Sequence, residues 1–232
     1  MIRPILAASA AALCLSLPAL AESRSYEVGE FTAISVSSGI DLVFETGGAT
    51  SISVENEKGK FGDIVVERQE ETLVLKRPRR TGIGSWSQRP RYKVTVTAPA
   101  LEAISASSGA DVTGTGLSGP NVSVEASSGA DVTITGISAG RISLESSSGS
   151  DIDVSGTCES IEAESSSGSD IDARELICQS ATADASSGSD ISLYASVRVR
   201  ADASSGGDVK VYGQPADAVM DKSSGGSVTL RD

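Results

Sequence analysis

Ser107-Ser108-Gly109-Ala110-Asp111 (SSGAD) is repeated letter for letter at residues 127–131, and close variants of it recur along the chain. The eight copies begin at residues 37, 107, 127, 147, 166, 186, 204 and 223. From Gly109 onward, the glycines of successive copies lie 18 to 20 residues apart. Such a period is typical of a solenoid, in which each repeat buries its apolar side by stacking on its neighbours. The motif therefore predicts a stack of similar coils.

The residues between two motifs alternate between apolar and polar side chains. Ile142 and Leu144 precede the turn at 147–151, Ile152 and Val154 follow it, and the residues between them are polar. Alternation at period two is the pattern of a half-buried β-strand. A second corner, often glycine, closes the coil at Gly116, Gly136 and Gly156. We therefore expect an all-β, single-stranded parallel β-helix with coils of 18–20 residues, each made of two short strands joined by SSGxD.

The aspartates of the motif should form a ladder of carboxylates, because stacked coils place equal positions one strand spacing apart. The ladder consists of Asp41, Asp111, Asp131, Asp151, Asp170, Asp190 and Asp208. Glycine suits the turn because it adopts positive φ without steric cost, and Ser and Asp suit it because they bond to nearby backbone. We expect each aspartate to complete an Asx-type turn. Calcium binding is the alternative, since hard cations take oxygen ligands, although no EF-hand loop is present.

The chain divides into three parts. Residues 1–21 have the pattern of a signal peptide: Arg3, an apolar stretch at 5–17, and a small-x-small site before Glu22. Residues 22–100 are strand-like but irregular, and we expect them to be the first coils of the same helix with insertions that cap its end. A separate small β domain is the alternative. Residues 101–232 carry the regular repeat. No later segment is apolar enough to span a membrane.

A basic segment at residues 76–93 interrupts the irregular part. Seven of its eighteen residues are Lys or Arg, and it contains the single tryptophan. Prolines and glycines predict a loop between strands. One hypothesis is that it binds an anionic envelope partner; the alternative is a solvated loop or one folded over the acidic coils. The residues that would make such a contact are Arg77, Arg79, Arg80, Trp86, Arg89 and Arg91.

Two cysteines follow the predicted signal peptide, and both lie ten residues before the glycine of the next motif. In a solenoid, equal phase would place Cys158 and Cys178 on adjacent coils, within the usual range of a disulfide. An exported protein reaches an oxidising compartment, which favours the bond. The alternative is that both are small residues at a corner, like Gly119 and Ala139 in other coils. The sequence leaves both possibilities open.

Composition argues against several function classes. The formal net charge of −12 is unfavourable for nucleic acid as a partner. There is no histidine, and aromatic residues make up 3% of the chain. No nucleophile motif stands out, and the repeated serine is not a catalytic serine because nothing distinguishes one copy from the next. Carboxylate pairs could be chosen from almost any two coils, so their spacing does not indicate a glycosidase.

Several strings of the chain resemble a known family. FTAISVSSGIDLVFETG (31–47), YKVTVTAPALEAISASSGADV (92–112), the SSGSD units and DKSSGGSV (221–228) are similar to the bacterial family called the putative auto-transporter adhesin head GIN domain. Their order is shared as well: a single first motif, an irregular stretch, a tandem array and a last motif without Asp. The resemblance covers about residues 31 to 230. It implies an exported, right-handed-type parallel β-helical domain of envelope proteins, and it supplies no catalytic residues.

We therefore expect an exported, non-enzymatic protein without a cofactor that mediates adhesion or surface interaction with a protein or glycan ligand. It would lie in the periplasm, on the outer membrane, at the cell surface or outside the cell. A periplasmic scaffold or ligand-binding module is the alternative, and a carbohydrate-active enzyme is less favoured. A coil that breaks the repeat to build a pocket would favour the enzyme. Open coil ends expose strand edges, so end-to-end self-association is a further possibility.

Overall fold

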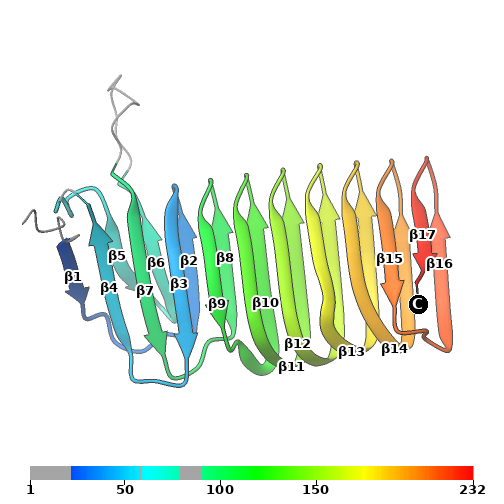
Figure 1. The fold of residues 1–232 in the computed structure, drawn as a ribbon, viewed down its shortest axis with the longest axis horizontal. Coiled ribbons are helices and arrows are strands. Elements are labelled where there is room, and N and C mark those ends of the chain that lie inside the picture. Colours follow the sequence, from blue (N-terminus) through cyan, green and yellow to red (C-terminus); the bar gives the residue numbers. More distant parts are fainter. Residues whose placement is uncertain (1–21, 58, 79–89, 232) are drawn as a thin grey trace, which may run out of the picture.

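The structure, a computed structural model, describes residues 22–57, 59–78 and 90–231. The predicted signal peptide and most of the basic segment lie outside these ranges. The described residues form strands only, all joined in one sheet that closes into a flattened solenoid (Figure 1). The expected all-β parallel solenoid is confirmed. The strands of the irregular part are β1 (Glu22–Tyr26), β2 (Ala33–Ser37), β3 (Ile40–Thr46), β4 (Ser51–Asn56), β5 (Val65–Gln69), β6 (Thr72–Lys76) and β7 (Tyr92–Ala98).

The first and last coils of the regular part consist of separate strands, whereas β11 to β14 each run on through the corner between two turns. For example, β11 starts after one SSG turn, bends near Gly136 and ends at the next turn. Neighbouring coils pair in parallel register, with Asp131 opposite Asp151. The strands are β8 (Ala103–Ser107), β9 (Asp111–Thr115), β10 (Ser118–Ser127), β11 (Asp131–Ser147), β12 (Asp151–Ser166), β13 (Asp170–Ser186), β14 (Asp190–Ala203), β15 (Asp208–Tyr212), β16 (Asp217–Lys222) and β17 (Ser227–Leu230).

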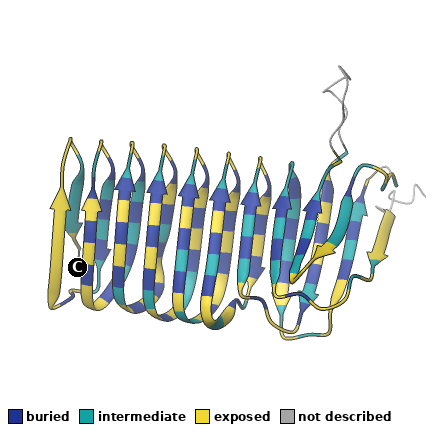
Figure 2. Ribbon diagram, turned by 180° about the vertical axis from the view of Figure 1, so that it is seen from behind, coloured by how far each residue is buried: buried dark blue, intermediate teal, exposed yellow. Residues whose placement is uncertain are grey.

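The core is a thin layer of aliphatic side chains between the two faces of the solenoid. Ile142 and Leu144 point inward from one face, Ile152 and Val154 from the other, and all four are almost fully buried. Figure 2 shows the resulting bands of buried and exposed residues across successive strands. Burying each such side chain contributes roughly 1.5–3 kcal/mol. Because each coil contacts mainly its two neighbours, stability depends on the stack as a whole.

The SSG turns depend on a conformation that is unusual for serine. In the turn at residues 107–109, Ser108 has a φ of 57° and Gly109 a φ of 69°, so two consecutive residues are left-handed. The same pair of positive angles recurs in every copy of the motif. The backbone groups so exposed bond to the next coil, where the Gly109 N–H donates to the Ser128 carbonyl at 3.2 Å. These coil-to-coil bonds support the turn.

The fourth position of the motif points into the core beneath the turn. It is alanine in the first two tandem copies and serine in the next three, and all five residues are buried. The hydroxyl of Ser150 lies 2.9 Å from the Ala126 carbonyl oxygen, and the Ser147 N–H donates to the Ser150 oxygen at 3.2 Å. These bonds satisfy a polar group that would otherwise be costly to bury.

The irregular part joins the solenoid in an order that differs from the chain order. Strands β2 and β3 pair in parallel with β8 and β9, so residues 33–46 form the coil next to the regular part. Strands β6 and β7 pair on the outer side of β2 and β3, although they come later in the sequence. Strands β5, β4 and β1 then add in antiparallel orientation and cover this end. The end of β6 and the start of β7 are therefore level with the two sides of the first SSG turn, with Leu75 opposite Val36 and Tyr92 opposite Ile40.

The two cysteines face each other on adjacent coils. Cys158 in β12 is in register with Cys178 in β13, their Cα atoms are 4.6 Å apart, and the two sulfurs are bonded. Both side chains are buried, so they fill a small gap at the corner as well as linking two coils.

The last coil leaves two strand edges open within the described residues. Strand β16 pairs with β14, β17 pairs with β15, and their outer edges carry no further strand. The inward position Met220 is 43% exposed, whereas its partner Ala201 in the preceding coil is buried (Figure 2). Self-association through such edges stays a prediction.

Candidate functional site

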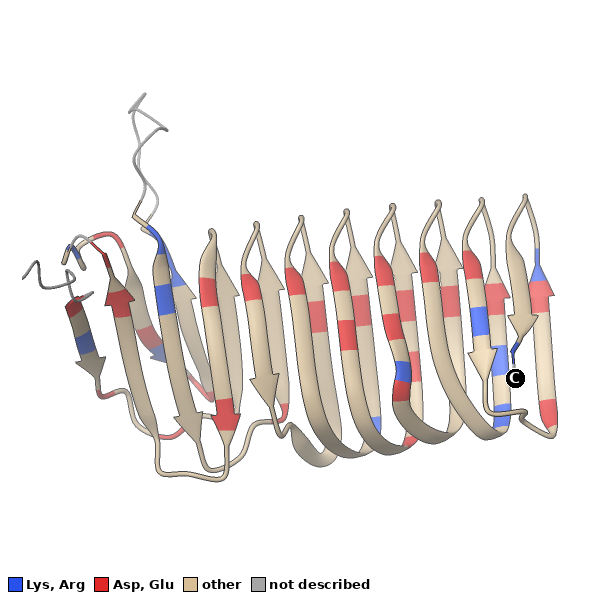
Figure 3. Cartoon of the chain, viewed as in Figure 1, with Lys and Arg blue, Asp and Glu red and all other residues tan. Residues whose placement is uncertain are grey.

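The predicted aspartate ladder exists as an unbroken column on one face of the solenoid. Each of its members from Asp41 to Asp208 is in register with the next, beginning with Asp41 opposite Asp111. Neighbouring parallel strands are about 4.8 Å apart, which sets the spacing of the carboxylates. We call this row the Asp column. In each coil, the aspartate of the column follows the SSG turn. The column therefore runs close to the ridge that the turns form (Figure 3).

A second column of carboxylates lies on the opposite face, at the same distance from the turns. It is hard to recognise in the sequence because the row changes from Glu to Asp along the solenoid and its residues stand before the motif rather than within it. Register pairs join all members in one row. We call it the Glu column, and it consists of Glu125, Glu145, Glu164, Asp184, Asp202 and Asp221.

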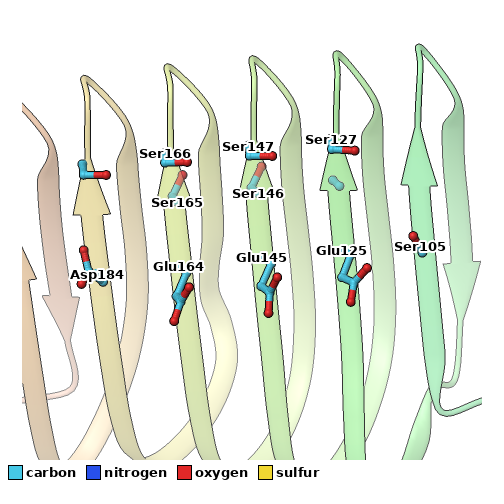
Figure 4. Close-up of a pocket in the computed structure, with 12 residues that line it drawn as sticks. Ser105, Glu125, Ser127, Glu145, Ser146, Ser147, Glu164, Ser165, Ser166 and Asp184 are labelled. Carbon is cyan, nitrogen blue, oxygen red and sulfur yellow. The ribbon is translucent and has the colours of Figure 1, made fainter.

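The two columns flank the turns, which we call the serine ridge (residues 37–39, 107–109, 127–129, 147–149, 166–168, 186–188, 204–206 and 223–225). Beside the ridge, a groove of about 390 Å³ runs along the Glu column over several coils. Figure 4 shows Glu125, Glu145 and Glu164 side by side, with Ser127, Ser147 and Ser166 above them. The site is thus an extended surface with one serine and one carboxylate per coil on this face.

Few cations neutralise these columns within the part of the chain that the structure describes. Asp190 forms an ion pair with Lys210 at 3.4 Å, and it is the one column member with such a partner there. At one point of the ladder a carboxylate accepts a backbone bond from the next coil, and the expected Asx turns stay a prediction. The Asp190 N–H donates to Oδ1 of Asp170 at 3.1 Å.

Repulsion within the columns contributes to raised pKa values of their central carboxyl groups. Burial, together with the charges of Asp151 and Asp111, raises the pKa of Asp131. Burial also raises the pKa of Glu145, with further contributions from Glu125 and Glu164. A raised carboxyl pKa means that the folded state disfavours the ionised form.

We expect replacement of one column aspartate to stabilise the fold at alkaline pH. Asp131→Asn removes two repulsions that cost roughly 0.8 kcal/mol each in water, so Tm should rise by about 2–4 °C at pH 8. The pKa of Asp131 is raised in the folded state, so above that pKa the carboxylate is ionised and its repulsion is fully present. Below the ordinary value of 3.8 the carboxyl is protonated and the repulsion is absent. The gain should therefore vanish as pH falls below 4.

Differential scanning calorimetry across this pH range measures the effect. Glu27→Gln, in an exposed loop, serves as the matched control and should leave Tm unchanged at every pH. A lower Tm of Asp131→Asn at pH 8 would contradict the prediction, since it would mean that the carboxylate stabilises its turn.

Calcium binding by the ladder stays a prediction. No group of three or more His, Cys, Asp or Glu side chains in the described ranges is arranged to hold a metal ion. The columns instead place carboxylates in single file.

The structure places Arg77, from the basic segment, inside an intramolecular network. Its side chain is 8% exposed and pairs with Asp63 at 3.0 Å. Its guanidinium also donates to the carbonyls of Ser38 and Pro90 and lies over the ring of Tyr92. Arg77 therefore fastens the base of the segment to the solenoid, which differs from the expected contact with an anionic partner.

The rest of the basic segment is described only at its end. Arg91 is exposed beside the Asp column, near Asp41 and Asp111. Arg79, Arg80, Trp86 and Arg89 lie outside the described residues, so their contact with an anionic partner stays a prediction. The described chain includes no helix of sufficient length and apolarity to cross a membrane.

Comparison with known proteins identifies a family for most of the chain. The family model described as "Putative auto-transporter adhesin, head GIN domain" matches residues 30–215. A search of curated proteins finds no match.

Several solved structures share the fold. A protein of Bacteroides fragilis described as a putative adhesin has a TM-score of 0.79 and 22% identity, over 90% of this chain and 96% of its own. A protein of Parabacteroides distasonis described as a putative lipid binding protein has a TM-score of 0.71 and 19% identity, over 91% and 96%. A putative adhesin of Parabacteroides merdae has a TM-score of 0.68 and 13% identity, over 91% and 96%. At these identities the similarity concerns the fold.

Proposed function

Because the chain belongs to the auto-transporter adhesin head GIN domain family, we propose that it is an exported cell-envelope protein that works by surface interaction and not by catalysis. The similar structures described as putative adhesins support an adhesive role. The signal-peptide pattern of residues 1–21 supports export.

One observation carries the proposal: two in-register columns of largely unneutralised carboxylates flank a serine ridge over successive coils. Such a surface offers the same acidic and hydroxyl groups once per coil. A single pocket beside the serine ridge would need one coil to differ there from the others, whereas a repetitive surface suits an extended partner bound at many points.

The charge of the columns favours a partner with repeated cationic groups, such as a basic stretch of an envelope or surface protein. The attraction extends over about 8–10 Å at physiological ionic strength, so it acts between surfaces before contact. Each rung adds a weak contact, and the rigid solenoid keeps the rungs at fixed spacing. Many weak contacts in register then produce useful avidity.

We expect the protein to be reached by protease from outside intact cells. Trypsin added to cells that produce it should remove the band detected by a specific antibody, because the segment between Arg77 and Arg91 is rich in cleavage sites. A periplasmic marker protein should stay intact in the same sample. Digestion only after the outer envelope is opened would contradict a surface location and favour the periplasmic scaffold or ligand-binding module.

A further inference from the structure

A hollow of about 530 Å³ is lined by residues of β13 and β14 and by residues at and after the end of β15. Figure 1 shows that β15 ends on the side of the solenoid away from the serine ridge. The hollow lies well away from the turns, so neither it nor its ligand depends on the function proposed for the ridge. Its volume is within the range of small-molecule sites, roughly 300–1,000 Å³. The residues that line it are Arg174, Ile177, Tyr194, Tyr212, Gly213 and Gln214.

The hollow gathers the aromatic residues of the regular part of the chain. Residues 101–232 contain two aromatic side chains, Tyr194 and Tyr212, and both line it. They are in register on β14 and β15, and Ile177 of β13 is opposite Tyr194. Both tyrosines are only partly buried, and Ile177 is 46% exposed. An outward apolar surface here contrasts with the mostly polar residues of other outward rows.

The ring of Tyr194 packs over a glycine, Gly213. Gly213 has a φ of 95°, and a Cβ at this position would be 2.7 Å from Cζ of Tyr194. The ring therefore occupies the space above the Gly213 backbone, and a side chain there would displace it. A fixed ring loses little conformational freedom when a ligand packs on it.

A break in the repeat supplies the polar side of the hollow. Between Ala173 and Ile177, strand β13 has a bulge, so residues 174–176 have no partners in β14. Bulges re-aim side chains and are common beside functional sites. Here the bulge brings out Arg174, whose Nε donates to Oδ1 and Oδ2 of Asp172 at 2.9 and 3.1 Å. Tyr212 lines the same hollow as this guanidinium.

We propose that this hollow, which we call the tyrosine hollow, is a binding subsite for one or two rings of an uncharged glycan. Tyrosine rings offer flat apolar surfaces to the C–H face of a sugar ring. The paired Arg174 and Asp172, with the Tyr212 hydroxyl, offer both donors and acceptors for sugar hydroxyls. Because Asp172 neutralises Arg174, the site favours neither an anion nor a cation.

The same observations disfavour other occupants. A lipid chain would leave the guanidinium and carboxylate without partners for their remaining hydrogen-bonding capacity. A folded protein needs roughly 800 Å² of contact on each side, which exceeds a hollow formed by six residues. An acidic glycan would meet the carboxylates of Asp172 and nearby Glu175.

The test uses the full chain, phosphatidylcholine vesicles and a panel of soluble oligosaccharides, namely the neutral β-glucan, mannan, xylan and chitin types and an acidic polygalacturonate. Isothermal titration calorimetry at millimolar ligand should show binding of at least one neutral type. Tyr194→Ala/Tyr212→Ala should weaken that binding by about tenfold or more, because both ring contacts are lost. Tyr194→Phe/Tyr212→Phe keeps the rings and should bind within a few-fold of the parent protein. Tm values equal to that of the parent would establish that both variants fold.

Three results would overturn the proposal. The first is no binding of any neutral oligosaccharide at millimolar concentration. The second is neutral-glycan binding that Tyr194→Ala/Tyr212→Ala leaves unchanged, which would place the contact elsewhere. The third is binding that depends on the tyrosines but occurs only with polygalacturonate or with phosphatidylcholine vesicles. Binding of polygalacturonate would assign the tyrosine hollow to an acidic glycan, and binding of vesicles would assign it to a membrane.

Discussion

Gly156→Ala should destabilise the protein by about 3 kcal/mol or more. Gly156 forms the second corner of its coil with a φ of 141°, and a Cβ there would be 2.2 Å from the Ile137 carbonyl oxygen. That oxygen belongs to the backbone of the preceding coil. The parallel ladder fixes this backbone, so moving it away from the new Cβ would be energetically costly. Both backbone strain and the clash therefore act against the variant. Thermal unfolding should show Tm lowered by roughly 6–12 °C.

Gly136→Ala is the matched control, because it alters the same corner one coil earlier. Gly136 also has a positive φ, 69°, but the atom nearest to an added Cβ is a Thr115 methyl group at 3.6 Å. Gly136→Ala should lose only the stability needed to place alanine in the left-handed conformation, about 1–2 kcal/mol. Equal losses in the two variants would show that the contact with Ile137 does not limit this corner.

The repeat made the solenoid predictable because its physical cause is local. The alternation of Ile142 and Leu144 with polar neighbours fixes which side faces the core, and the period of the motif fixes the size of the coil. The turn was predicted less completely. Left-handed Gly109 was expected, but left-handed Ser108 was not, because serine disfavours that region and only the bonds to the next coil offset its cost.

The irregular part could not be ordered from sequence. Residues 22–100 were expected to form the first coils with insertions, yet β6 and β7, which come later in the chain, lie outside β2 and β3. The alternation pattern of a strand does not determine which strand it pairs with, because pairing depends on the path of the chain between strands. The ion pair of Arg77 could not be predicted for a similar reason, because its partner Asp63 is fourteen residues away in an irregular stretch.

Only part of the candidate site could be predicted from the sequence. The Asp column belongs to the motif and was found, whereas the Glu column mixes two residue types and was not. Tyr194 and Tyr212 are eighteen residues apart, a separation that matches the period and could have identified them. The bulge that brings Arg174 beside them depends on pairing between strands, which the sequence alone does not reveal.

Neutralising the Glu column should remove most binding to a repetitive cationic surface. The variant changes every member, as Glu125→Gln, Glu145→Gln, Glu164→Gln, Asp184→Asn, Asp202→Asn and Asp221→Asn. These carboxylates lie about 4.8 Å apart in one row, well within the screening length, so their attractions act together. We expect the apparent affinity for immobilised poly-L-lysine to fall by about tenfold or more. Loss of repulsion within the row should leave the fold at least as stable as before.

The most direct test of the account compares this variant with one of equal net charge. The control replaces six exposed carboxylates of the irregular part by glutamine, at Glu22, Glu27, Glu30, Glu57, Glu70 and Glu71. Surface plasmon resonance on poly-L-lysine at physiological salt would measure all three proteins. If the aligned column is the contact surface, the column variant loses binding and the control keeps affinity within about twofold of the parent. Equal losses in both variants, or none in either, would contradict a role for the aligned column.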